Sequence, residues 1–231
     1  MLDADGGFAK PVIYTWSLIE QYETCPFKAY HQNVIKDIPW VETVENKWGN
    51  EVHSALERCA RLRVLPEDRF KELSYIAAAF LSATGELRPE VKLGVDRRLH
   101  ACDFYAPEVF IRGNNADLII DYDKWAVVWD YKTGKKKTGS KQLMLTALMV
   151  FAKFPRLEKL ICSFIWTQAK TLKPEKEIYY RHQIPEMWKR FLVIIGEIEH
   201  CNTANIWYKR QNGLCRAYCP VVSCEYNGRH K

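Results

Sequence analysis

Two acidic residues and a lysine lie close together near the middle of the chain. Asp117 is part of "GNNADLII", and Asp130 and Lys132 are part of "VVWDYK". Carboxylate oxygens are the ligands that Mg²⁺ and Mn²⁺ prefer, and the backbone carbonyl of Tyr131 could add a third ligand. On a strand, Lys132 points to the same face as Asp130, where its ammonium group can activate an attacking water or offset charge on a phosphate. The pattern predicts a metal-dependent site that hydrolyses phosphodiesters.

The same residues also fit a simpler interpretation. An apolar strand that ends in D-x-K is common at a strand-to-turn junction, and this tripeptide alone is a weak signal. The loop that follows is rich in lysine, at Lys135, Lys136, Lys137 and Lys141. We treat these lysines as candidate phosphate contacts, with a solvated loop as the alternative.

The elements that must position these residues follow from hydrophobic periodicity and turn signals. Predicted helices cover 15–35 (interrupted at Pro26), 45–63, 66–84, 140–154 and 185–202. Predicted strands cover 90–99, 108–123, 124–133, 158–168 and 175–184. The class is therefore α/β, with a mixed central sheet flanked by helices.

The short turn "DYDK" predicts that the strands 108–123 and 124–133 pair as a hairpin. With a slight register offset, this pairing brings Asp117 and Asp130 to one end of the sheet. The strand 124–133 is continuously apolar, as expected for a central strand, and a crossover should lead from it to the strand 158–168.

Bulk composition limits the remaining function classes. The chain has 231 residues, of which 48% are hydrophobic and 27% charged, as in an ordinary globular protein. No apolar run is long enough for a membrane span, and the acidic start "MLDADGG" has no apolar signal core, so we expect a cytoplasmic protein without membrane contact. The net charge of +6 slightly favours an anionic partner such as nucleic acid.

Four ordered motifs carry a family resemblance. "GNEVH", "GNNAD", "DYKTG" and "KQLML" follow one another, and "SLIEQYETCPFKAY" precedes them. Between about residues 14 and 224 the chain resembles the PD-(D/E)XK nuclease superfamily, and in particular its RecB-like exonuclease branch, which includes CRISPR-adaptation, mitochondrial and phage exonucleases. The resemblance implies a restriction-endonuclease-like core.

The resemblance also implies a role for each matched residue. His53, Asp117 and Asp130 match the metal-site positions, Lys132 the catalytic lysine, and Gln142 a glutamine that orients the lysine or the DNA near the scissile phosphate. Glu90 fits an upstream acid of the metal site, with a solvated glutamate as the alternative; for His53 the alternative is a structural histidine at a helix edge. One position departs from the family pattern, because Thr146 stands where a tyrosine is frequent, which puts any ring contact from there in doubt.

Four cysteines in loop-like contexts form a second constellation. Several members of this family hold a [4Fe–4S] cluster with one cysteine near the N-terminus and three near the C-terminus, which here match Cys25, Cys215, Cys219 and Cys224, although the middle cysteine of the last three is shifted by one position. A Zn²⁺ ion, or no metal at all, remains an alternative. The expected organisation is a single domain, with a helical part at 14–84, a catalytic core at 88–200 and a cysteine-rich tail at 201–231 that packs back near Cys25.

Taken together, the sequence predicts a Mg²⁺- or Mn²⁺-dependent DNA exonuclease that acts on DNA ends or single strands. Replication, recombination, repair or DNA degradation would be its setting, in a bacterial cell or a phage-infected host. Two alternatives stay open: a catalytically inactive DNA-binding or scaffolding module of the same fold, and a structure-specific endonuclease.

Overall fold

The computed structural model describes residues 12–113, 115–134, 141–169, 171–172 and 174–230. Its residue contacts group the chain into two units, which we treat separately. Glu42–Trp188 forms the sheet unit, and the segments up to Val41 and from Lys189 onward form the cysteine unit. The acids and the lysine of the predicted site lie in the sheet unit, and the four loop cysteines lie in the cysteine unit.

A mixed five-stranded sheet is the centre of the sheet unit, with the strand order β1-β4-β5-β6-β7. Its strands are β1 (Glu86–Val91), β4 (Ala116–Asp121), β5 (Trp125–Lys132), β6 (Lys159–Trp166) and β7 (Lys176–Tyr180). β5 and β6 run parallel, whereas the other neighbours are antiparallel. The predicted hairpin between β4 and β5 and the predicted crossover from β5 to β6 are both confirmed.

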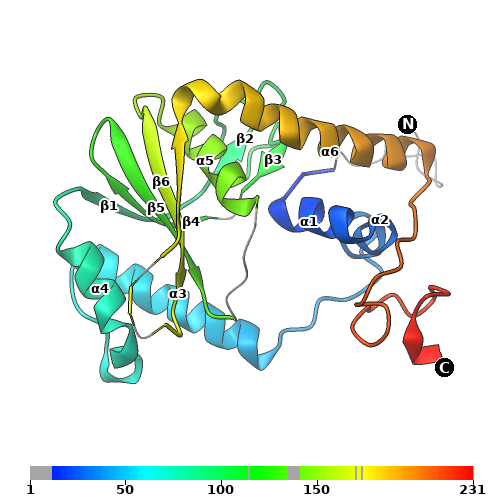
Figure 1. Ribbon diagram of the computed structural model, residues 1–231, viewed down its shortest axis with the longest axis horizontal. Helices are drawn as coiled ribbons and strands as arrows, with labels where there is room; N and C mark the ends of the chain where they lie inside the picture. Colours follow the sequence, from blue (N-terminus) through cyan, green and yellow to red (C-terminus); the bar gives the residue numbers. More distant parts are fainter. Residues whose placement is uncertain (1–11, 114, 135–140, 170, 173, 231) are drawn as a thin grey trace. The chain divides into compact units, whose positions relative to one another are not determined.

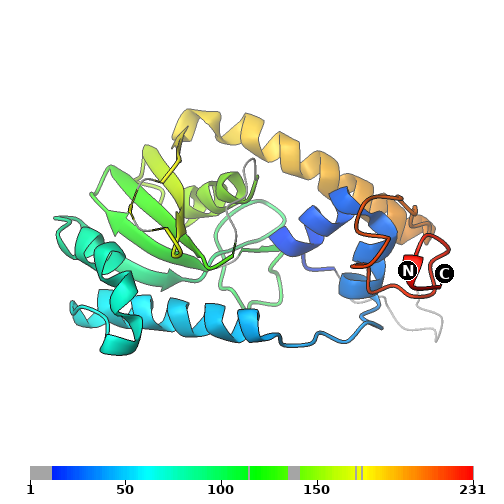
Figure 2. The same cartoon turned by 60° about the horizontal axis from the view of Figure 1, so that its bottom comes forward.

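Helices cover both faces of this sheet (Figure 1 and Figure 2). On one face, α3 (Val44–Leu62) and α4 (Ser74–Leu81) pack against Trp129 and Tyr131 of β5. On the other face lies α5 (Gln142–Lys153), the crossover helix between β5 and β6. Because alternate residues of a strand point to opposite faces, Asp130 points toward α5 while its two neighbours point toward α3. This arrangement confirms the predicted α/β class.

Helix α3 owes its position to a clear amphipathic pattern. Val52, Leu56 and Cys59 are buried at helical spacing. The side chain of Thr43 caps its start by accepting a hydrogen bond from the backbone N–H of Asn46, and Arg63 ends it in the left-handed conformation. The helix is therefore fixed at both ends and along one face, which determines where its polar residues point.

Several predicted elements differ from the structure, among them the strand 108–123, which divides into β3 and β4, and the strand 175–184, which ends at Tyr180. The predicted helix over 66–84 divides into a 3₁₀ segment η2 (Asp68–Leu73) and α4, because Phe70 has non-helical backbone angles. The predicted strand over 90–99 begins earlier, as β1, and Pro89 is tolerated there because β1 is an edge strand. Residues further on form a separate two-stranded sheet of β2 (Gly94–Val95) and β3 (Ile111–Arg112).

The cysteine unit is helical at its start and irregular at its end. It contains α1 (Trp16–Thr24), α2 (Pro26–Ala29), the π-helical turn η1 (Tyr30–Val34), most of α6 (Ile184–Ala204) and the short η4 (Gly228–His230). The predicted interruption at Pro26 is confirmed, since α1 ends at Thr24 and α2 begins at the proline. Among the described residues, no helix has the length and apolar character that crossing a membrane requires.

Candidate active site

The two strand acids lie at one end of the sheet, on adjacent strands. Leu118 of β4 pairs with Trp129 of β5, so Asp117 and Asp130 occupy the next position along the hairpin, with no register offset needed. The backbone N–H of Tyr131 donates a hydrogen bond to Asp117 Oδ2 at 2.5 Å. Both carboxylates are buried, at 7% and 6% exposure. Local strand geometry alone therefore places the two acids side by side.

Helix α3 brings His53 to the same place. His53 Nδ1 lies 3.0 Å from Asp117 Oδ1, and the imidazole meets the ring of Tyr131 edge-on, with the ring centroids 5.8 Å apart. One turn earlier on the helix, a Cβ added to Gly49 would lie 3.2 Å from Thr133 Oγ1. The glycine of "GNEVH" thus permits the close approach between α3 and the end of β5 that His53 requires.

Glu90 completes a group with metal-ligand spacing. One ligand atom each from His53, Glu90 and Asp117 lie within 4.8 Å of one another. Ligands about 2.0–2.4 Å from one ion can be at most about 4.8 Å apart, so the group fits a single divalent cation. Glu90 has a positive φ of 52°, and Asn115 Nδ2 donates a hydrogen bond to its Oε2 at 2.8 Å. The sequence interpretation missed Asn115, although it lies inside the "GNNAD" motif.

Asp130 has different partners. Its Oδ1 lies 2.6 Å from Lys132 Nζ, and its Oδ2 accepts a hydrogen bond from Gln142 Nε2 at 2.8 Å. Gln142 begins α5, so five elements of the structure supply site residues: β1, β4, β5, α3 and α5. Asp130 is not part of the group with metal-ligand spacing, and its two oxygens contact the lysine and the glutamine.

Burial and neighbouring charges shift the protonation equilibria of these acids. Burial, together with the Asp117 charge, raises the pKa of Asp130 to about 6, although the Lys132 ammonium group acts in the opposite direction. Burial is also the main reason why the pKa of Glu90 is raised, with the charges of Asp117 and Glu57 adding to it. Several buried carboxyl groups therefore lie close together with few positive charges nearby, and a divalent cation would offset the repulsion between their ionised forms.

The imidazole of His53 is subject to opposing influences. Its burial lowers its pKa, but the hydrogen bond and charge of Asp117 and the charges of Asp130 and Glu90 outweigh burial, so the pKa is raised overall. A metal-binding imidazole must be neutral, and a metal-binding carboxyl group must be ionised. Cation binding at this site must therefore displace protons from both kinds of group.

We therefore expect Mg²⁺ binding to tighten as pH rises. Because the pKa of Asp130 in the folded chain is raised to about 6, its stabilising contribution without metal is present below about pH 4 and is lost as pH rises through its folded value. Above about pH 6 the carboxyl group of Asp130 is mostly ionised, and the site attracts a cation. The rise in Tm that Mg²⁺ produces should be small near pH 5 and large near about pH 8. Equal Mg²⁺-induced shifts at the two pH values would contradict this expectation.

The sequence also singles out the lysines of the loop before α5 and Thr146. Lys135, Lys136 and Lys137 lie outside the described residues, and Lys141 is exposed immediately before α5. Thr146, at the position where a tyrosine was expected, is buried on α5 one turn after Gln142. No aromatic ring therefore projects from this position of α5 toward the site.

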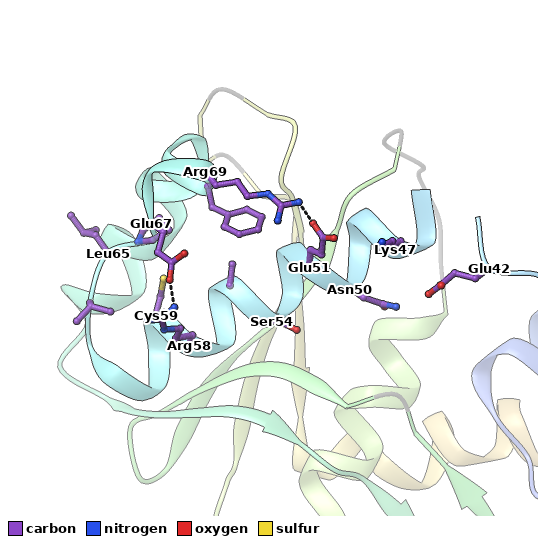
Figure 3. A pocket seen from close by; sticks show the side chains of 14 residues that line it. Glu42, Lys47, Asn50, Glu51, Ser54, Arg58, Cys59, Leu65, Glu67 and Arg69 are labelled. Carbon is purple, nitrogen blue, oxygen red and sulfur yellow. Dashed lines mark hydrogen bonds and ion pairs between the residues drawn. The ribbon is translucent and has the colours of Figure 1, made fainter. Parts of the chain in front are cut away.

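A separate pocket of about 520 Å³ lies along α3 (Figure 3). Two ion pairs cross it, between Arg58 and Glu67 and between Arg69 and Glu51, and each joins α3 to the segment that follows it. None of the acids or the lysine of the candidate active site lines this pocket. Its ion pairs help hold the helix that carries His53, and the chemistry lies elsewhere.

In the cysteine unit, one pocket is lined by all four predicted cysteines. Cys25 Sγ accepts a hydrogen bond from the backbone N–H of Arg210 at 3.5 Å, and Cys215 Sγ accepts one from that of Asn212 at 3.4 Å. All four are free thiols, and such N–H···S bonds are typical of thiolates that bind iron–sulfur clusters. The four thiols therefore fit the ligands of a metal centre.

The separation of the four sulfur atoms is wider than the ligand spacing at the candidate active site. Within the described part of the chain, the only group of three candidate ligands closer than 4.8 Å is His53, Glu90 and Asp117, so no three of these thiols lie that close together.

Comparisons with known proteins agree with this architecture. The family model for the "PD-(D/E)XK nuclease superfamily" matches residues 14–224. A solved structure described as "Putative exonuclease" from Eubacterium rectale is 11% identical, with 100% of this chain and 93% of that chain covered and a TM-score of 0.50. Another, described as SSO0001, is 17% identical, with 93% and 86% covered and a TM-score of 0.48. No curated protein sequence gives a significant match. The family match and the mixed sheet together confirm the expected restriction-endonuclease-like core.

Proposed function

The chain belongs to the PD-(D/E)XK nuclease superfamily, and from this premise we propose that it is a Mg²⁺- or Mn²⁺-dependent deoxyribonuclease. We further propose that it acts as an exonuclease on DNA ends or single strands, in the cytoplasm of a bacterial or phage-infected cell. One observation carries the proposal: the His53–Glu90–Asp117 group and the Asp130–Lys132 pair meet at one end of the sheet. The first can hold a hard cation, and the second supplies a mobile proton and a positive charge.

The cation-binding role belongs to His53, Glu90 and Asp117, with Asp130 and the carbonyl of Tyr131 as further candidate ligands. When bound, Mg²⁺ or Mn²⁺ polarises the phosphate and makes water a better nucleophile. Asp117 is held for this role by two contacts, from the Tyr131 N–H and from His53, so its carboxylate cannot turn away. Asn115 similarly fixes Glu90. The site is therefore preorganised before substrate arrives.

Lys132 has a distinct role. Its ammonium group is held at Asp130 and lies 5.0 Å from the centroid of the Phe164 ring, which restricts where it can move. From there it can orient the attacking water or offset the charge that develops on the phosphate oxygens, and only the neutral amine form of Lys132 can accept the proton of that water. Gln142 donates a hydrogen bond to the other oxygen of Asp130, which fixes the orientation of the carboxylate toward Lys132.

Digestion of end-labelled linear DNA and closed circular DNA with Mg²⁺ tests the exonuclease proposal. We expect the linear DNA to be degraded from its ends and the circle to survive. Cleavage of the circle would instead identify an endonuclease. Absence of cleavage of either DNA with Mg²⁺ or Mn²⁺ would favour an inactive DNA-binding module and overturn the proposal.

We also propose that Cys25, Cys215, Cys219 and Cys224 bind a [4Fe–4S] cluster with a structural role, since hydrolysis requires no electron transfer. Anaerobically purified protein should be brown and contain about four iron atoms per chain. Cys219→Ser should lose the colour and most of the iron. Cys102→Ser, which changes a cysteine of the sheet unit, should keep both. Colourless, iron-free wild-type protein, or zinc in place of iron, would contradict the cluster assignment.

A further inference from the structure

The segment between Glu90 and Asp117 connects two acids of the candidate active site. Its two short strands, β2 and β3, pair with each other, and the backbone N–H of Gly113 donates to the carbonyl of Leu93 at 2.9 Å. The two ends of the segment therefore lie together. Since two residues of chain span at most about 7 Å, Lys92 lies close to Glu90. Side chains of this segment can thus meet a substrate bound at the site.

Tyr105 projects from this segment with its ring held in place. The residue is 67% exposed. Lys92 Nζ lies 4.7 Å from the ring centroid, and the guanidinium carbon of Arg112 lies 5.7 Å from it. Arg112 is itself fixed, because its Nε donates to the carbonyl of Phe104 at 2.8 Å. The backbone N–H of Tyr105 donates to Asp103 Oδ1 at 2.8 Å, which holds the turn.

The two cations beside this ring differ from several other cations of the sheet unit, which are ion-paired. Within the part of the chain that the structure describes, neither Lys92 nor Arg112 forms an ion pair with a carboxylate. By contrast, Arg58 and Arg69 are each paired with a glutamate. The positive charge near Tyr105 is thus available to an anion, and both of its sources lie within 6 Å of the centre of an exposed aromatic ring.

We propose that Tyr105, Lys92 and Arg112 form a subsite for a single-stranded nucleotide next to the scissile phosphate. Any base has a flat face that can stack on an exposed aromatic ring, and adjacent cations hold the phosphates on either side. The bases of a duplex are stacked on one another, so they cannot use the ring. The subsite rests on the proposed nuclease function and adds to it a preference for an unpaired strand.

Binding measured without cleavage tests the subsite separately from the activity. Fluorescence anisotropy in EDTA would use the full chain and a labelled oligothymidine of about 20 nucleotides. Tyr105→Ala should raise the Kd about 5- to 140-fold, as loss of one stacked base predicts. Tyr105→Phe keeps the ring and should bind like the wild type. Tyr180→Ala should also bind like the wild type. Tyr180 is a 40% exposed tyrosine on β7, the edge strand at the far side of the five-stranded sheet from β1.

Salt dependence gives a second readout that does not depend on the ring. Lys92→Ala should lower the slope of log Kd against log salt by about 0.7–1, because one phosphate contact is lost. The wild type should also bind the single strand more tightly than a duplex, and Tyr105→Ala should remove most of that difference.

Several results would overturn the subsite: Tyr105→Ala binding as tightly as the wild type, Tyr180→Ala weakening binding equally, or an unchanged salt slope in Lys92→Ala. Failure of the wild type to bind the oligothymidine would do the same. None of these results bears on the nuclease proposal, which the digestion of linear and circular DNA decides independently.

Discussion

Asp130→Asn should reduce DNA cleavage by at least about 10³-fold, as expected for a group that acts as one unit with its neighbours. Asparagine has nearly the same size and can still accept a hydrogen bond from Gln142, so the packing at the end of β5 should survive. What disappears is the negative charge that holds Lys132 Nζ at 2.6 Å and that contributes to cation binding. Initial rates with saturating Mg²⁺ measure the effect.

The same substitution should not destabilise the protein. Burial and the Asp117 charge raise the pKa of Asp130, which means that its ionised form is unfavourable in the metal-free fold. A neutral amide removes that cost, so the Tm of Asp130→Asn without metal should equal or exceed that of the wild type. A lower activity with an unchanged or higher Tm would separate a catalytic role from a structural one.

Asp123→Asn is the matched control. Asp123 lies in the turn between β4 and β5, has an exposed side chain (74%) and a φ of 70°, a conformation that asparagine tolerates well. Its substitution should leave the cleavage rate unchanged. Asp130→Asn cleaving at the wild-type rate would remove Asp130 from the site.

Lys132→Met should lower the cleavage rate by about 10²–10⁴-fold, the range for loss of a general acid–base group. Methionine keeps much of the aliphatic length beside the ring of Phe164, but it has no proton and no charge. Because Lys132 opposes the raised pKa of Asp130, its loss should raise that pKa further. Metal binding should then require a higher pH, and this effect must be separated from the loss of the lysine itself.

Measurement at saturating Mn²⁺ and at about pH 8 separates the two effects, since the carboxylates are then ionised. If Lys132 acts directly, Lys132→Met remains impaired under these conditions. Lys132→Arg keeps the charge but cannot release a proton near neutral pH. A rate close to that of the wild type in Lys132→Arg would identify charge stabilisation, whereas a loss equal to that of Lys132→Met would identify proton transfer. Full activity of Lys132→Met would contradict both roles.

Local patterns predicted the elements that carry this chemistry. Strand alternation predicts that Lys132 lies on the same face as Asp130, and the structure has the two side chains in contact. The short turn before Trp125 predicts the hairpin that places Asp117 beside Asp130. The predicted helix between two apolar strands is long enough for a crossover connection. In the structure this helix is α5, and it brings Gln142 to Asp130. Each of these features depends on residues close in sequence.

Other features depend on contacts that periodicity does not encode. Glu90 reaches the site because β1 pairs with β4 and because its own φ is positive, and neither property is visible in "RPEVKL". Asn115 contacts Glu90 across 25 positions of sequence. The small β2–β3 sheet and the exposed ring of Tyr105 lie where the sequence predicts the strand 90–99, a connection, and the start of the strand 108–123. Edge strands and insertions of this kind are decided by tertiary contacts rather than by local propensity.

The four cysteines also show what sequence spacing alone does not decide. Their sequence spacing suggests a shared metal but does not distinguish a cluster from zinc. The structure adds the pocket that all four line and the N–H···S bonds to Cys25 and Cys215.

The central claim is that a divalent cation held by the acids at the end of β4 and β5 is required for phosphodiester hydrolysis. The most direct test is the cleavage rate of an end-labelled DNA strand when Mn²⁺ is returned to EDTA-treated protein, for the wild type and for Asp117→Asn. We predict no cleavage in EDTA, full recovery in the wild type, and no recovery in Asp117→Asn at any Mn²⁺ concentration. Cleavage that persists in EDTA, or equal recovery in both proteins, would contradict the account.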